Sequence, residues 1–113
     1  MSHLLFITHP EVVIDPAVPV PDWGLSVIGR ARMAAFAASP RAAGIGAVWS
    51  SAERKADEAA AMLAAPRGRT PRVLETLQEN DRSATGYLPP EQFWPVVADF
   101  FDKPEISVRG WER

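Results

Sequence analysis

The apolar residues of this chain fall into short runs that alternate with stretches of helical spacing. The runs at residues 4–8, Ile45–Trp49 and Arg72–Leu74 predict three short β-strands. Between the strands, the stretches 26–40 and 50–66 carry apolar residues three and four positions apart, which predicts two amphipathic helices. Strand and helix therefore alternate, as they do in proteins built on a parallel sheet.

Capping residues place the ends of the two helices. Ser26 is expected to cap the first helix and Pro40 to end it, with a buried stripe of Val27, Ile28, Ala31, Ala34, Ala35 and Ala38. The segment Ser50-Ser51-Ala52-Glu53 has the spacing of a capping box, so the second helix is expected to begin at Ser50. This second helix is expected to end at Pro66-Arg67-Gly68 and to bury Ala56, Ala59, Ala60 and Leu63.

Two loops and a third helix complete the expected elements. Residues 10–24 hold four prolines and predict a loop, and Glu75–Leu88 predicts a polar loop. A third helix is predicted by the stripe Phe93, Val96, Val97, Phe100 and Phe101, and Pro104 ends it. Pro95 falls inside this stripe, where a proline costs about 3 kcal/mol, so the helix either starts near Pro95 or is kinked there.

These elements predict an α/β fold, a mostly parallel sheet with helices on its faces, in one domain spanning residues 1–113. The apolar content of 47% is enough for a packed core, so we expect a folded globular protein rather than a disordered one. The net charge is −2 with no basic block, which argues against nucleic-acid and membrane partners. The absence of cysteine excludes disulfides and a cysteine nucleophile, and with no basic leader we expect a cytoplasmic protein.

Polar side chains follow two of the predicted strands. Thr8 and His9 come at the end of the first strand, and Ser50, Ser51 and Arg54 follow the second. The carboxyl ends of parallel strands meet at one edge of a sheet, where ligands bind in open α/β folds. A histidine, a guanidinium and a helix N-terminus at one edge predict a phosphate site. The other histidine, His3, precedes the first strand and so lies at the opposite edge, where it cannot share a metal ion with His9.

Four segments in order resemble one known family, from residue 4 to about residue 93. The histidine phosphatase superfamily, the phosphoglycerate-mutase-like proteins, has the motifs Arg-His-Gly-Glu, Leu-Thr-x-x-Gly, Ser-Ser-x-x-x-Arg-Ala-x-x-Thr and Leu-x-Glu-x-Asp. The matching segments here are Thr8-His9-Pro10-Glu11, Leu25-Ser26 with Gly29, Ser50 to Ala56 with Ala59, and Leu77 to Asp81. The third match places Arg54 one residue from the family's arginine if Ser50-Ser51 is the serine pair.

The resemblance implies a phosphoglycerate-mutase-like fold and a phosphatase or phosphomutase reaction that proceeds through a phosphohistidine on His9. Glu79 would be the proton donor, and the phosphate would be bound by Thr8, Arg54, Ser50 and Ser51. The enzyme would be a phosphoric monoester hydrolase that needs no cofactor or metal. Its partner would be a small phosphorylated ligand or a phosphoprotein.

The chain also departs from the family pattern. Thr8 stands where the family has arginine, Pro10 stands where it has glycine, and the family's second histidine, after a later strand, has no counterpart. We therefore expect this chain alone to be inactive, as the amino-terminal part of a longer enzyme. The alternative is a catalytically impaired relative that binds a phosphorylated ligand or a protein partner. A third possibility is an assembly module that forms homo-oligomers through an uncovered sheet edge.

Overall fold

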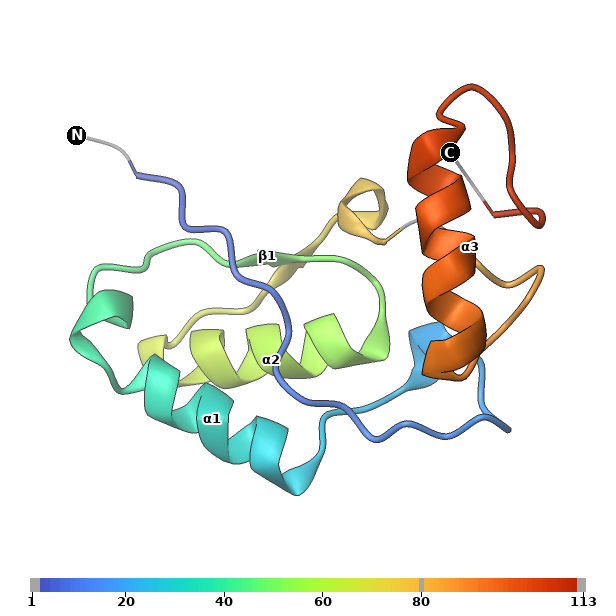
Figure 1. Ribbon diagram of the computed structural model, residues 1–113. Coiled ribbons are helices and arrows are strands. Elements are labelled where there is room, and N and C mark those ends of the chain that lie inside the picture. The colour runs from blue at the N-terminus through green and yellow to red at the C-terminus, as the bar shows by residue number, and fades with distance from the viewer. Residues whose placement is uncertain (1–2, 80, 112–113) are drawn as a thin grey trace. The chain divides into compact units, whose positions relative to one another are not determined.

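The computed structural model describes residues 3–79 and 81–111 and shows a small α/β protein (Figure 1). The described residues form three α-helices and one parallel sheet of two strands. The elements are, in chain order, α1 (Val27–Ala37), β1 (Trp49–Ser50), α2 (Arg54–Ala64), β2 (Arg72–Val73) and α3 (Pro90–Asp102). The chain divides into two compact units, one with the described residues of 1–14 and 21–78 and the other with those of 15–20 and 79–113.

The sheet has strands near two of the three predicted places. β2 lies within the predicted strand Arg72–Leu74, whereas β1 overlaps the predicted strand Ile45–Trp49 only at Trp49 and extends to Ser50. Trp49 pairs with Arg72 and Ser50 with Val73 in parallel register. The Arg72 N–H donates to the Val48 carbonyl at 2.9 Å, and the Leu74 N–H donates to the Ser50 carbonyl at 2.8 Å. The crossover between the strands is α2, as the alternation of strand and helix predicts.

The predicted first strand is wrong, because residues 4–8 adopt no strand in the structure. Leu4 is 95% exposed and Phe6 is 83% exposed, so the run is not buried either. An apolar run becomes a strand only where a neighbouring strand offers hydrogen bonds, and the run itself does not reveal that neighbour. Further along, an isolated antiparallel bridge joins Val12 to Leu25.

Helix α1 begins where the sequence predicts but buries a different face. Its N-cap is Ser26, whose hydroxyl accepts a hydrogen bond from the Gly29 N–H at 3.0 Å. The buried residues are Gly29 and Met33, whereas Val27 is 86% exposed, so the predicted stripe is wrong. The helix is rich in alanine and apolar on most sides, and a stripe read from such a sequence is ambiguous.

The predicted start of the second helix is also wrong. Helix α2 begins at Arg54 with Glu53 at the N-cap, and the Glu53 side chain makes no capping hydrogen bond to the first turn. Ser50 remains in β1, where its carbonyl takes part in the sheet and its hydroxyl donates to the Ser51 carbonyl. The predicted end is confirmed, since Gly68 follows the short 3₁₀ turn after α2 with a left-handed φ of 65°.

The core of the first unit lies between α1, α2 and β1. Of the predicted α2 stripe, Ala59, Ala60 and Leu63 are buried and Ala56 is partly buried. The full buried set is Leu25, Met33, Ala42, Val48, Ala59, Ala60, Leu63 and Ala64. Arg67 closes one end of this core, because its guanidinium donates to the carbonyls of Leu63, Ala37 and Ala42.

The second unit is built on α3. The helix begins at Pro90 rather than near Pro95, and Pro95 lies inside it. The core of the second unit consists of the buried residues Val96, Val108 and Trp111. The partly buried residues packed against them are Leu88, Phe93, Val97 and Phe100. Phe101, placed in the buried stripe by the sequence, is instead 74% exposed.

Helix α1 lies very close to the N-terminal segment at Gly29, and from this we predict the effect of a substitution there on stability. A Cβ at Gly29 would overlap the Glu11 carbonyl oxygen, which also accepts the Ser26 N–H. Exchange of glycine for alanine inside a helix normally stabilises it by up to about 1 kcal/mol. We expect Gly29→Ala instead to lower the free energy of unfolding by about 1–3 kcal/mol, because the backbone must shift. Urea unfolding followed by circular dichroism measures this change.

Gly44→Ala is the matched control, because nothing lies within 4 Å of a Cβ added at Gly44. Its free energy of unfolding should stay within about 0.5 kcal/mol of the parent value. Equal free energies of unfolding for the two variants would show that a Cβ at Gly29 does not conflict with the Glu11 carbonyl oxygen.

Candidate functional site

The structure separates the predicted site residues into two groups. Glu79 lies in the second unit. The other five belong to the first unit, and they are Thr8, His9, Ser50, Ser51 and Arg54.

The end of β1 and the start of α2 carry a cluster of buried polar side chains. Ser50 and Ser51 are 7% and 6% exposed, Glu53 is 8% exposed and Lys55 is 4% exposed. We call these four residues the β1–α2 polar cluster. They are the buried polar and charged side chains of the described part of the chain, and they fall within six consecutive positions at the carboxyl end of a parallel strand. Burial of polar groups is unfavourable, so this concentration marks a candidate site.

A buried ion pair lies at the centre of the cluster. Lys55 Nζ lies 3.3 Å from Glu53 Oε2, and the two side chains are 5% and 9% exposed. The Ser50 hydroxyl donates to the Ser51 carbonyl at 3.0 Å. Removing two charges from water costs several kcal/mol per ion before their attraction offsets it, by order of magnitude. Such a pair is therefore weak evidence of a purely stabilising role.

Arg54, the predicted phosphate ligand, lies at the surface in an ion pair. Its side chain is 63% exposed, and its Nε lies 3.4 Å from Glu58 Oε1. A second guanidinium nitrogen donates to the Asp22 carbonyl at 3.5 Å. Glu58 also accepts the Leu25 N–H at 3.1 Å and pairs with Arg30. The Glu58 carboxylate thus offsets the charge of Arg54 and joins α1 to α2.

His9 is held by a local hydrogen bond. Its Nδ1 lies 2.7 Å from the Pro10 carbonyl oxygen, and the ring is partly buried. An N–H at Nδ1 is the tautomer that can donate to this carbonyl, and the lone pair is then at Nε2. A histidine nucleophile needs that arrangement. Thr8, beside it, is exposed.

Glu79, the predicted proton donor, is an exposed residue of the second unit. Arg82 donates to its carboxylate at 3.1 Å, three residues along the chain. Nearby, hydrogen bonds from the side chain and the N–H of Ser83 lower the pKa of Asp81 below its usual value.

Sequence reasoning missed Lys55 and Glu53 as site residues. A signal for Lys55 was present in the motif comparison. With Ser50-Ser51 as the serine pair, three residues separate the pair from the family's arginine, and the position reached is Lys55 followed by Ala56. The structure adds that Lys55 is buried and Arg54 is not.

No family model matches this sequence, and no curated protein matches it either. Within residues 3–79 and 81–111, no group of three potential metal ligands occurs. No helix of this part of the chain is long and apolar enough to span a bilayer. The molecule is a small α/β protein with a parallel sheet of two strands in its described part, and its candidate site is the β1–α2 polar cluster.

Proposed function

We propose that the β1–α2 polar cluster binds the phosphate of a phosphomonoester, in a phosphoglycerate-mutase-like site where His9 is the nucleophile. The observation that carries this proposal is the buried Lys55, with the two serines beside it at the carboxyl end of β1. A buried ammonium is a compact charge suited to a phosphate oxygen.

The start of α2 adds to the attraction for an anion. The first N–H groups of a helix have no partner within the helix, and its N-terminus carries a partial positive charge. Glu53, at the N-cap, does not use its side chain to cap this turn. Lys55, Ser50 and Ser51 supply an ammonium and two hydroxyls at the same end of the helix. Glu53 balances the Lys55 charge, and a phosphate would compete with the Glu53 carboxylate for the ammonium.

The reaction proposed for this site is phosphoryl transfer. His9 Nε2 attacks phosphorus, a bond forms between nitrogen and phosphorus, and the bond to the ester oxygen breaks. A carboxylic acid protonates the leaving oxygen, a role that the family resemblance alone assigns to Glu79. Water then hydrolyses the phosphohistidine and regenerates the imidazole.

The alternative is a protein that binds a phosphorylated ligand and does not turn it over. The pairing of Arg54 with Glu58 favours it, because a second cation is withheld from the ligand. Thr8 favours it too, since a hydroxyl replaces the family's arginine beside His9. Under this alternative, Lys55 and the serines bind and His9 does no chemistry.

Titration with p-nitrophenyl phosphate separates the two functions. If the protein is an enzyme, His9→Ala is expected to lower nitrophenol release by more than about 10³-fold, because the nucleophile is lost. If it is a binding protein, both forms bind the ester without release. Calorimetry measures binding, and absorbance measures release.

His3→Ala is the control for the loss of a histidine, since His3 is exposed and lies outside the cluster. It should behave as the parent in both measurements. A parent protein that neither binds nor hydrolyses the ester would overturn the proposal. Equal release by parent and His9→Ala would remove His9 from the reaction.

A further inference from the structure

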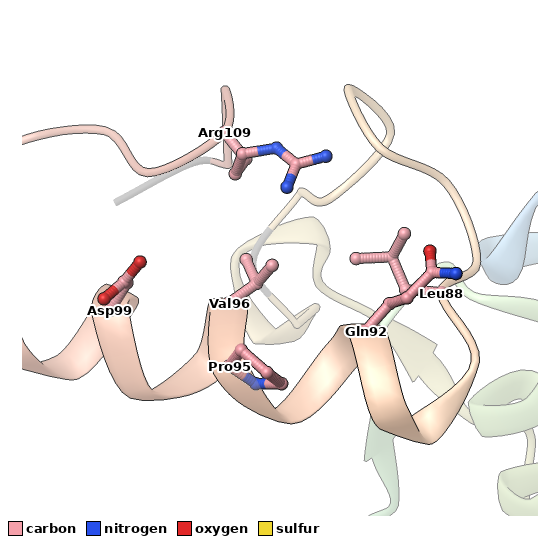
Figure 2. Close-up of a pocket in the computed structure, with 6 residues that line it drawn as sticks. All are labelled: Leu88, Gln92, Pro95, Val96, Asp99 and Arg109. Atoms are coloured by element: carbon pink, nitrogen blue, oxygen red, sulfur yellow. The ribbon is translucent and has the colours of Figure 1, made fainter.

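The second unit contains a pocket of about 270 Å³ between α3 and the segment that follows it. Figure 2 shows α3 forming its floor, with Arg109 extending over it from the far side. The lining residues are Leu88, Gln92, Pro95, Val96, Asp99 and Arg109. Pockets for drug-sized molecules start near 300 Å³, by order of magnitude, so this one suits a smaller ligand.

Arg109 is held over the pocket by an unfavourable backbone conformation. Its φ is 54°, in the left-handed region that residues with a Cβ avoid, and Gly110 follows with a φ of 80°. Such conformations are unfavourable and persist where the surrounding structure enforces them, often at ligand sites.

Packing on both sides of Arg109 enforces that conformation. Val108, the residue before Arg109, is 8% exposed and Trp111, two residues after it, is 3% exposed, so the core holds the chain on both sides. The Trp111 indole N–H donates to the Thr85 hydroxyl at 2.9 Å, and the Ser107 hydroxyl donates to the Trp111 carbonyl at 2.9 Å. The Arg109 backbone is therefore preorganised.

The Arg109 guanidinium makes no hydrogen bond or ion pair with any residue that the structure describes. Neighbouring cations of the second unit are engaged, since Lys103 lies 3.8 Å from Asp99 and Arg82 lies 3.1 Å from Glu79. In Figure 2 the Arg109 guanidinium points toward the side of the pocket where Leu88 and Gln92 lie. The pocket is thus lined by both a fork of donors and an amide.

We propose that this pocket binds a small organic carboxylate with a short branched apolar body. Arg109 and the Gln92 amide would donate to the carboxylate, since a guanidinium matches its two oxygens. Leu88, Pro95 and Val96 supply the apolar surface for the body. Asp99 at the other end of the pocket disfavours a more highly charged anion such as a phosphate. This site is independent of the phosphate site proposed above.

Titration with 3-methylbutanoate, followed by NMR of the whole chain, tests the proposal. The carboxylate is expected to shift the signals of Leu88 and Val96, and 3-methylbutanamide, its neutral match, is not. Arg109→Asn should weaken binding by about tenfold or more, because a charge-assisted pair is lost. Asparagine tolerates a left-handed φ, so this variant keeps the backbone.

Gln92→Glu gives a second test that does not touch the strained segment. Gln92 is exposed on α3, and a carboxylate there would repel the ligand, again by about tenfold. Arg69→Asn, an exposed arginine of the first unit, is the control for loss of charge. Inorganic phosphate measures the response to an anion alone. Equal binding by parent and Arg109→Asn, equal binding of acid and amide, or no binding of the acid would overturn the proposal.

Discussion

Glu53→Ala is expected to lower the free energy of unfolding of the first unit by about 3–5 kcal/mol, because it leaves a buried charge on Lys55 without this carboxylate. Both side chains are less than one tenth exposed, and their charged atoms lie 3.3 Å apart. Urea unfolding monitored by circular dichroism measures the loss.

The double variant Glu53→Leu with Lys55→Met is the matched control, since it removes both charges and keeps the volume. Its stability should equal the parent value or exceed it by about 1–4 kcal/mol, because no ion remains to be desolvated. The same variant should lose binding of p-nitrophenyl phosphate if Lys55 holds the ligand. A Glu53→Ala variant within about 1 kcal/mol of the parent would show that the pair is not buried in solution.

Trp111→Ala is expected to cost about 3–5 kcal/mol of stability, the range for removal of a buried aromatic side chain. Trp111 is 3% exposed, and its ring centroid lies 5.9 Å from that of Phe93 and 5.8 Å from that of Phe100. Its indole N–H also donates to Thr85, which would be left without that partner. Amide hydrogen exchange along α3 measures the effect on the second unit.

Trp94→Ala is the control for Trp111→Ala, because Trp94 is a tryptophan of the same unit, on α3, but is 63% exposed. Its edge-to-face contact with Phe93 is worth about 0.5–1.5 kcal/mol, so its loss should be no larger. A similar loss for the two variants would contradict the packing described here. If the first unit keeps its exchange protection in Trp111→Ala, the two units unfold separately.

Two of the predictions that proved correct rest on local signals. Ser26 caps α1 through a bond to a residue three positions on, and Gly68 adopts the left-handed conformation that stops the chain after α2. The apolar run 4–8 carried an equally clear pattern but adopts no strand. A strand depends on a distant partner, which a local pattern does not contain.

The candidate site was predictable in position but not in detail. The carboxyl end of β1 was expected to carry Ser50, Ser51 and a cation, and the structure places buried polar groups there. Which cation is buried depends on the rotation of α2 about its axis. That rotation follows from the packing of Ala59, Ala60 and Leu63, and it turns Lys55 inward and leaves Arg54 at the surface.

By itself, the sequence determined the class of fold, the order of its helices, the cap of α1 at Ser26 and the stop after α2 at Gly68. The tertiary structure alone decided three further features: the unpaired state of residues 4–8, the buried pair of Lys55 with Glu53, and the left-handed Arg109 over its pocket. The physical reason is the distance along the sequence over which each interaction acts. Capping and backbone preference act over three or four residues, whereas burial and pairing depend on groups brought together only when the chain folds.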